Sequence, residues 1–343
     1  IYLSKRNFFR LFRFLFPRSI YFNIASFWGL IRYLKKEQPN SLMTARNAPL
    51  GVLVKFFLKI RTQIIIREPL HISSMLKNKS VLIRSFNFMI KKFVYKYSDK
   101  VIAISDFIAG HICQVYGVPV AKILSIPRGV DLSKFDTSKV SEQRIIEQAK
   151  KWRLPDGVPV IMLPGRLTRW KGHAVFIEAI KEIGHTNFQC LIVGADQGRY
   201  NYRQKLESEI ARHGLSEVIH VIDHCEDMPA AYMLTDIVVS ASTEPEAFGR
   251  VAAEAQSLGR LVIAADHGGA RETVIDGKTG WLTPPGDARA LATTINKVLA
   301  QSEEKRQIFS DRAIQHIREK YSKTKMCEKT LQVYNAILDS ETL

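Results

Sequence analysis

Apolar residues in the second half of the chain form short, nearly continuous runs separated by longer amphipathic stretches. The runs cover residues 158–163, 188–193, 218–222, 236–240 and 261–264. Helical patterns lie near 172–183, 200–213, 228–234, 249–258 and 269–275. Unbroken apolar runs of this length are typical of strands buried on both faces. Strands that alternate with helices predict right-handed crossovers and a doubly wound parallel sheet.

The first half shows a looser version of the same alternation. Strands are predicted at 41–44, 63–67, 100–104 and 123–126, with helices near 20–37, 49–59, 84–97 and 105–116. The first of these helices has Ile24, Phe27, Trp28, Ile31 and Leu34 at helical spacing. The final 60 residues predict helices over 287–300, 303–319 and 322–338. We therefore expect one domain at 1–130, a second at 131–320 and a terminal helix within 321–343.

Length and composition agree with two globular domains. A chain of 343 residues exceeds what one core usually serves, and 46% hydrophobic with 24% charged residues is a globular composition. The four cysteines, Cys113, Cys190, Cys225 and Cys327, lack the spacing of metal ligands, and we interpret them as reduced thiols of a cytosolic protein. No apolar run reaches the ~18 residues that would span a bilayer.

The positive charge lies in the first hundred residues. That segment holds 20 Lys and Arg against 3 acidic residues, whereas the remainder holds 30 of each, so the net charge of +17 comes from the first part. The run from Lys5 to Phe16 interleaves cations with aromatic rings, a pattern that suits an anionic membrane surface. Nucleic acid is the rival partner for such charge, but no nucleic-acid-binding motif accompanies it. A merely solvated basic face is the third interpretation.

The stretch from Glu244 to Glu254 carries the clearest chemical signal. It follows an apolar run and opens a predicted helix, so the carboxylates of Glu246 and Glu254 lie eight residues apart across a strand-to-helix turn. The N–H groups from Phe248 to Val251, those of Gly249 and Arg250 included, are the unpaired donors of a helix N-terminus, which favours an anion such as phosphate. An ordinary turn before an acidic helix is the plainer interpretation.

Five segments in order resemble the glycosyltransferase family 4 enzymes, which are retaining and have the GT-B fold. Glu246 and Glu254 match the Glu-x7-Glu element of that family. The other four segments are Gly165-Arg-Leu-Thr-Arg-Trp-Lys-Gly172, Ile126-Pro-Arg-Gly-Val-Asp131, Gly268-Gly-Ala-Arg-Glu272 and Gly277-Lys-Thr-Gly280. The resemblance covers roughly residues 99–290. It implies two Rossmann-like domains facing a cleft, with a terminal helix that crosses back to the first domain and packs there through Tyr334 and Leu338.

The resemblance also implies roles for site residues. Glu246 would hold the transferred sugar and Glu254 the donor ribose, while Arg166, Lys171 and the helix N-terminus would neutralise the diphosphate. His71 would contact the donor sugar, and Arg46 and Asn47 are acceptor-side candidates. Gly194 falls just after a strand, at the edge where such sheets bind ligands, and is a further donor-side candidate. No Asp-x-Asp pair is present, so we expect metal-independent chemistry without a cofactor or a protein nucleophile.

Two departures from the family pattern favour an alternative. Family members begin with a strand and a glycine-rich loop that have no counterpart before Ser4, so we expect an N-terminal domain that lacks its first strand. Ile72 replaces the glycine that usually follows the histidine. The first hypothesis is an enzyme of lipopolysaccharide or polysaccharide synthesis with a lipid-linked or glycan acceptor, cytoplasmic and peripheral to the inner face of a bacterial membrane. The alternative is a truncated, inactive relative that only binds nucleotide.

Overall fold

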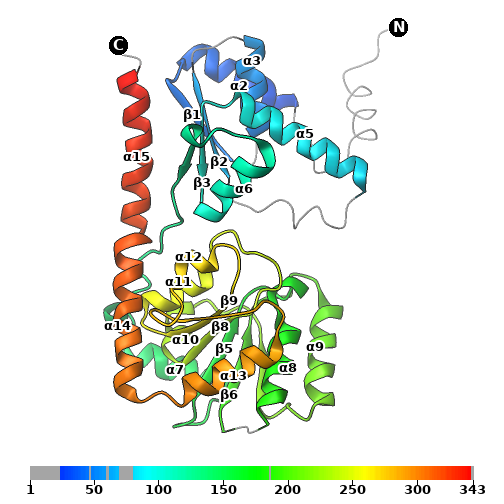
Figure 1. Ribbon diagram of the computed structural model, residues 1–343, viewed down its shortest axis with the longest axis vertical. Coiled ribbons are helices and arrows are strands. Elements are labelled where there is room, and N and C mark those ends of the chain that lie inside the picture. Colours follow the sequence, from blue (N-terminus) through cyan, green and yellow to red (C-terminus); the bar gives the residue numbers. More distant parts are fainter. Residues whose placement is uncertain (1–23, 46–47, 59–61, 69–79, 185–186, 341–343) are drawn as a thin grey trace.

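The computed structural model describes residues 24–45, 48–58, 62–68, 80–184 and 187–340. Each half of the chain forms an α/β unit around its own parallel sheet, and the last two helices run in succession along one side, beside the second unit and then the first (Figure 1). The predicted α/β class with two parallel sheets is confirmed. His71, Arg46, Asn47 and the basic run from Lys5 to Phe16 lie outside the described residues.

The second unit is built on a six-stranded parallel sheet of order β10-β9-β8-β5-β6-β7. The strands are β5 Val160–Pro164, β6 Gln189–Val193, β7 Ile219–Ile222, β8 Ile237–Ser240, β9 Leu261–Ala265 and β10 Trp281–Thr283. The strand β10 was not predicted, and the helix predicted at 269–275 is a single turn, α12 Ala270–Thr273. That turn ends because Val274 adopts an extended backbone, which leads the chain toward β10.

Helices cover both faces of this sheet, and its side chains alternate between them. Ile161 and Leu163 of β5 face the cluster formed with α8, α9 and α13, whereas Val160 and Met162 face α10, α11 and α12. These elements are α7 Glu142–Trp152, α8 His173–Ile183, α9 Tyr200–Arg212, α10 Met228–Met233, α11 Arg250–Ser257 and α13 Ala288–Leu299. The strands are therefore buried on both faces, which explains their continuous apolar sequences.

The first unit has a four-stranded parallel sheet of order β1-β2-β3-β4 among the described residues. Its elements are α2 Ile24–Glu37, β1 Ser41–Thr44, α3 Ala48–Leu58, β2 Gln63–Glu68, α5 Val81–Tyr97, β3 Lys100–Ala103, α6 Asp106–Tyr116 and β4 Ile123–Ser125. Ser105 caps α6 by accepting a hydrogen bond from the Ile108 N–H. On α2, Leu34 is buried but Trp28 is 61% exposed, so the expected apolar face is only partly covered.

The chain returns to the first unit through α14 Glu303–Lys320 and α15 Lys323–Ser340. At their junction Val130 donates a backbone hydrogen bond to Tyr321 (2.7 Å) and accepts one from Lys323 (2.8 Å). Val333 and Ile337 of α15 are buried against Ile65 and Ile102 of the first sheet. They also contact Ile126, which directly follows β4. The prediction for Tyr334 is confirmed, since it is partly buried in this cluster, but Leu338 is 49% exposed.

A carboxylate joins the two units close to the candidate site. The Glu272 side chain on α12 accepts hydrogen bonds from the N–H groups of Asp106 (2.9 Å) and Phe107 (2.7 Å) at the start of α6. A negative charge at this end of a helix is stabilised by the helix dipole. Phe248 adds an apolar contact because it belongs to the core cluster of the first unit. The two units therefore meet through specific contacts at the ends of their sheets.

Within the described ranges, the helices include none with both the length and the apolar character needed to cross a membrane.

Candidate functional site

The candidate residues meet at the carboxyl edge of the six-stranded sheet. Arg166 follows β5, Gly194 follows β6, Glu246 follows β8 and Asp266 follows β9, and parallel strands bring these ends to one rim. In open α/β sheets this edge is where ligands bind. The four residues come from separate loops, so their meeting is a property of the fold.

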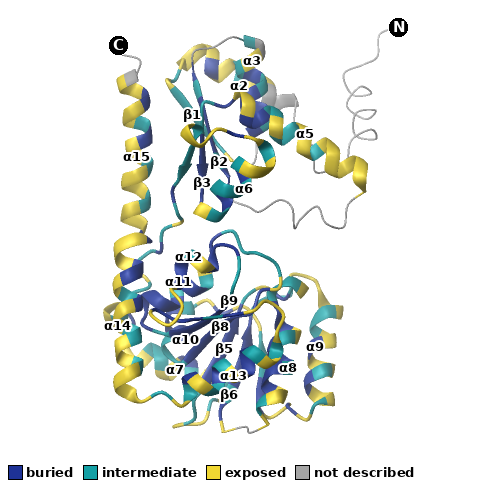
Figure 2. Cartoon of the chain, in the orientation of Figure 1, coloured by how far each residue is buried: buried dark blue, intermediate teal, exposed yellow. Residues whose placement is uncertain are grey.

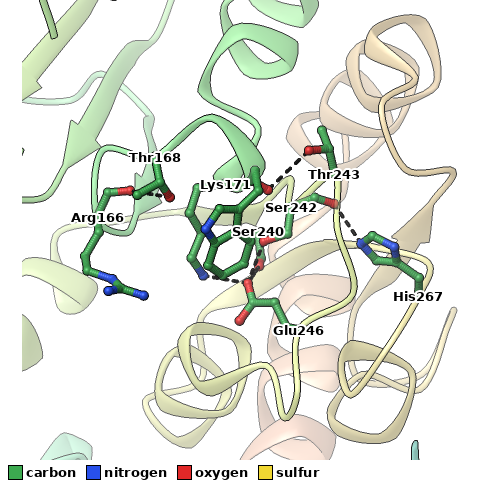
Figure 3. A network of polar contacts seen from close by, with 9 residues as sticks. Arg166, Thr168, Lys171, Ser240, Ser242, Thr243, Glu246 and His267 are labelled. Carbon is green, nitrogen blue, oxygen red and sulfur yellow. Dashed lines mark hydrogen bonds and ion pairs between the residues drawn. The ribbon is translucent and has the colours of Figure 1, made fainter. Parts of the chain in front are cut away.

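Glu246 is the centre of a buried polar network (Figure 3). Its Oε1 lies 2.7 Å from the Lys171 Nζ and accepts hydrogen bonds from the hydroxyls of Ser242 (2.6 Å) and Ser240 (3.4 Å). The Lys171 and Glu246 side chains are each 11% exposed. Burial alone would raise the pKa of Glu246, but Lys171 and the serine hydroxyls hold it below its ordinary value. Glu246 therefore stays ionised at neutral pH.

Glycines let the three loops of this network pack closely. Gly172 has φ of +77°, and a Cβ there would overlap the Ala241 carbonyl, so the Lys171 loop lies directly against the end of β8. Gly268 has φ of +59°, and a Cβ there would lie 2.5 Å from the Glu246 carbonyl oxygen. The next residue, Gly269, donates its N–H to that oxygen (2.8 Å). The backbone of Glu246 is thus fixed from two sides.

The anion-binding features predicted for the turn before α11 are present. Gly249, at φ of +82°, precedes the helix, and Arg250 begins it, so the N–H groups of its first turn have no partner within the helix. In Figure 3 the Arg166 guanidinium lies apart from the Glu246 carboxylate, and no hydrogen bond or ion pair joins them. Within the described part of the chain no side chain pairs with Arg166. Free cationic and N–H donors beside an ionised carboxylate suit a ligand that carries both anionic groups and hydroxyls.

Glu254 lies one turn into α11 in a different environment. It accepts a hydrogen bond from the buried Tyr232 hydroxyl (3.3 Å) and lies 3.4 Å from Arg250, and its side chain is 17% exposed. Burial raises the pKa of Glu254 more than Arg250 and Tyr232 lower it. The two carboxylates of the motif are therefore shifted in opposite directions, with Glu254 the first to take up a proton on acidification.

We predict that nucleotide binding weakens on acidification through Glu254. Only the ionised carboxylate accepts two ribose hydroxyls, so the Kd for a nucleoside diphosphate should rise as pH falls from 8 to 5. Glu254→Gln should bind about tenfold more weakly at pH 8 and show a smaller pH slope. Isothermal calorimetry of both proteins measures the Kd at each pH. Protonation of the ligand's own phosphate affects both proteins equally, so it cancels when the two pH slopes are compared. Equal slopes would contradict the role of Glu254.

The raised pKa of Glu254 also predicts that the ionised side chain, although needed for nucleotide binding, lowers the stability of the fold. A carboxyl whose pKa is raised by folding stabilises the fold below its unfolded pKa and loses that contribution as pH rises through the folded value. Ionised Glu254 therefore destabilises the fold at pH 8, and Glu254→Gln should unfold at a higher temperature there than the unmodified protein.

Three other predicted donor-side residues have structural explanations in the fold. A Cβ at Gly194 would overlap the Gly165 carbonyl, so glycine is required there for two loops to pass each other. The Phe248 side chain is 4% exposed and lies edge-on to Tyr321 at 5.6 Å between ring centroids. Val251 is partly buried against the sheet. The backbone roles proposed for these residues stay predictions.

Several polar residues of the site were missed in the sequence. Ser240 and Ser242 bind Glu246, and His267 contacts the Ser242 carbonyl through Nε2 (2.8 Å). Burial together with the charges of Arg250 and Arg67 lowers the pKa of Arg128 in the segment 126–131, so Arg128 lies within electrostatic range of both cations. The motif at 126–131 carried no signal for this. Among the described residues no group of three His, Cys, Asp or Glu is placed to hold a metal ion.

Comparison with known proteins agrees with the geometry. Residues 144–316 match the family model described as glycosyl transferases group 1, and residues 5–134 match that of glycosyltransferase family 4. A D-inositol 3-phosphate glycosyltransferase of Xylanimonas cellulosilytica is 31% identical over 207 residues, which are 59% of this chain and 49% of that protein. The chain spans about half the length of the curated relatives it matches.

Solved structures show the same fold across nearly the whole chain. A glycosyltransferase from Rickettsia africae is 27% identical with a TM-score of 0.80, covering 94% of this chain and 83% of that one. Anabaena Alr3699/HepE in complex with UDP is 23% identical with a TM-score of 0.80, covering 90% and 82%. The GT-B fold expected from the motifs is confirmed. The chain belongs to the group 1 glycosyl transferases.

Proposed function

We propose that this protein is a retaining glycosyltransferase that moves a sugar from a nucleoside-diphosphate sugar to a glycan or lipid-linked acceptor. The observation that carries the proposal is the buried Glu246–Lys171 pair, which lies at one sheet edge with Arg166 and the N-terminus of α11. Anion donors and a buried carboxylate are what a diphosphate-linked sugar requires of a site. Membership of the group 1 family supports this interpretation.

Each element has a distinct role in the proposed reaction. Arg166 and the N–H groups of α11 bind the diphosphate, and Glu254 binds the ribose. Negative charge develops on the leaving phosphate as the glycosidic bond breaks, and Lys171 is positioned to neutralise it. Glu246 holds the hydroxyls of the sugar that is transferred. The leaving phosphate takes the proton of the acceptor hydroxyl, so the mechanism needs no protein nucleophile.

We place the acceptor at an anionic membrane surface because of the α5 helix. Its first turns are coloured as exposed in Figure 2. The exposed apolar residues of these turns are Val81, Leu82, Ile83, Phe86, Phe88 and Met89. The cations of the same helix with exposed side chains are Arg84, Lys92 and Lys96. Apolar side chains flanked by cations suit the boundary between headgroups and acyl chains. A lipid-linked glycan of the cell envelope, lipopolysaccharide included, is the proposed acceptor class, and the inner face of the cell membrane the proposed location.

The donor site is tested by thermal unfolding with UDP, GDP and ADP. A ligand of the native state raises its apparent stability by RT ln(1 + [L]/Kd), so we expect one of the three to shift the midpoint by several degrees at 100 times its Kd. Arg166→Ala should lose most of the shift. Binding without hydrolysis of the matching nucleotide sugar would favour the inactive relative, and no shift in a folded chain would overturn the donor site.

The membrane proposal is tested by flotation with vesicles. The protein should bind vesicles rich in phosphatidylglycerol, release at high salt and ignore pure phosphatidylcholine. A triple substitution of Leu82, Phe86 and Met89 by Ser should weaken binding at least about tenfold, because each side chain contributes apolar burial. Leu331→Ser, which changes a 60% exposed residue on α15, is the matched control. Equal binding by both variants would contradict a role for α5.

A further inference from the structure

A pocket on the rim of the second unit has no part in the donor site described above. Its volume is about 460 Å³. One wall comes from the loop between β5 and α8, and the other from the end of the segment before α9 and from the first turns of α9 itself. The lining residues are Thr168, Arg169, Gly198, Arg199, Tyr200, Asn201, Tyr202 and Lys205. Pockets of this size hold small ligands such as one sugar residue.

The pocket is lined by three cations and no carboxylate. The Arg199 guanidinium is held in place by the Asp196 carbonyl (2.9 Å) and the Gln197 side chain (3.3 Å). Arg169 and Lys205 have no ion-pair partner among the described residues. This unpaired charge is available to an anionic ligand.

The carboxylates around the pocket do not pair with its cations. Glu207 and Asp223 both pair with Arg203, and Asp196 accepts the N–H of the lining residue Gly198 (2.8 Å). Among the described residues none of these three carboxylates forms an ion pair with Arg169, Arg199 or Lys205. Guanidinium groups bind carboxylate and phosphate oxygens in pairs, which gives the pocket a preference for such groups over neutral sugars.

The pocket is joined structurally to the loop that carries Arg166 and Lys171. Thr168 and Arg169 belong to that loop, and the Thr168 hydroxyl donates to the Arg166 carbonyl (3.4 Å). The Tyr202 hydroxyl contacts Nδ1 of the fully buried His173 (3.4 Å), which begins α8 directly after Gly172. Burial raises the pKa of Tyr202 to about 12, so its hydroxyl stays neutral. A ligand in the pocket thus lies beside the proposed donor loop.

We propose that this pocket binds an anionic substituent, a phosphate or a carboxylate, of the acceptor glycan. The inference rests on the proposed glycosyltransferase function. Arg169, Arg199 and Lys205 pair with the anion, and the 68% exposed Tyr200 offers its ring to the sugar that bears it. Binding there selects acidic or phosphorylated acceptors over neutral ones and holds them next to the donor.

The test separates this pocket from the donor site. The protein is first saturated with the nucleoside diphosphate that stabilises it, so that the donor phosphate site is occupied. Inorganic phosphate and glucuronate are then titrated at constant ionic strength, with the unfolding midpoint as the readout. The test variant is Arg169→Ala with Lys205→Ala. The control is Arg289→Ala with Lys297→Ala, which removes two exposed cations from α13 of the same unit.

We expect saturable stabilisation by at least one anion, weakened at least tenfold in the pocket variant and unchanged in the control. A response to phosphate identifies a phosphorylated acceptor, and a response to glucuronate identifies an acidic sugar. No saturable response, or equal affinity in the pocket variant, overturns the proposal. If the nucleotide itself gives no shift, the proposed donor function fails. The anion titration is then repeated without nucleotide, and Arg166→Ala is compared with the pocket variant. Affinity lost only in the pocket variant then still supports the pocket.

Discussion

Glu246→Gln should abolish sugar transfer while leaving nucleotide binding intact. Glutamine keeps an oxygen that can accept from Lys171, Ser240 and Ser242, so the loop retains its hydrogen bonds. It removes the negative charge that we propose holds the sugar and that pairs with Lys171. Lys171 loses its counter-charge, so we expect the variant to be less stable and its kinetics to be measured on protein shown to be folded. We expect transfer and slow donor hydrolysis to fall by at least about 100-fold, the range found when one preorganised polar group of an active site is removed. Steady-state kinetics with the nucleotide sugar measure this loss.

Binding of the free nucleoside diphosphate is the internal control for that variant. It carries no sugar for Glu246 to contact, and loss of a carboxylate near the phosphates reduces repulsion. Its Kd should therefore stay the same or fall. A rise in Kd that parallels the loss of turnover would show that Glu246 supports the loop and does not act on the sugar.

The second sheet was well predicted because its strands are buried on both faces. The run predicted at 188–193 is observed as β6 Gln189–Val193, and the run at 236–240 as β8 Ile237–Ser240. Here the apolar run and the strand coincide. β10 has only three residues, Trp281–Thr283, which is too short for a period to be recognised.

Helical faces were less well predicted where tertiary contacts decide them. Tyr334 and Leu338 share one side of α15, but the buried pair is Val333 and Ile337. A shift of one residue turns a helix by about 100°, and the sequence period does not say which neighbour the helix meets. Trp28 is another case, since it belongs to the same predicted apolar set as Leu34 although only Leu34 is buried.

The candidate site was predicted as a set of residues and not as a network. The resemblance assigned Lys171 to the diphosphate and Glu246 to the transferred sugar, yet their ion pair joins residues 75 apart in the sequence. Ser240 and Ser242 gave no signal because a serine after a strand is common. Spacing within one loop can indicate an anion site, whereas pairing between loops depends on strand order, which only the fold supplies.

Lys171→Met should destabilise the fold as well as weaken nucleotide binding. The substitution keeps the bulk of the side chain but leaves the buried Glu246 carboxylate without its cation. Breaking a buried pair on one side costs about 3–5 kcal/mol of unfolding free energy, since the remaining charge is uncompensated. Denaturant titration at pH 7.5 measures the loss. The cation above the Trp170 ring, 4.6 Å from its centroid, is removed at the same time.

The double variant Lys171→Met with Glu246→Gln isolates the buried charge as the cause. It carries no uncompensated carboxylate, so it should regain most of the lost stability while remaining inactive, and a double-mutant cycle gives the coupling. Glu246 has a depressed pKa in the folded protein, so its pairing stabilises the fold above the unfolded pKa and is lost as pH falls through the folded value. The difference between Lys171→Met and the unmodified protein should therefore be largest at neutral pH and shrink on acidification. Two outcomes would show that the lost contacts of Lys171 matter and the buried charge does not. One is that the stability changes of the two single variants add up to that of the double variant, and the other is that the stability lost in Lys171→Met does not depend on pH.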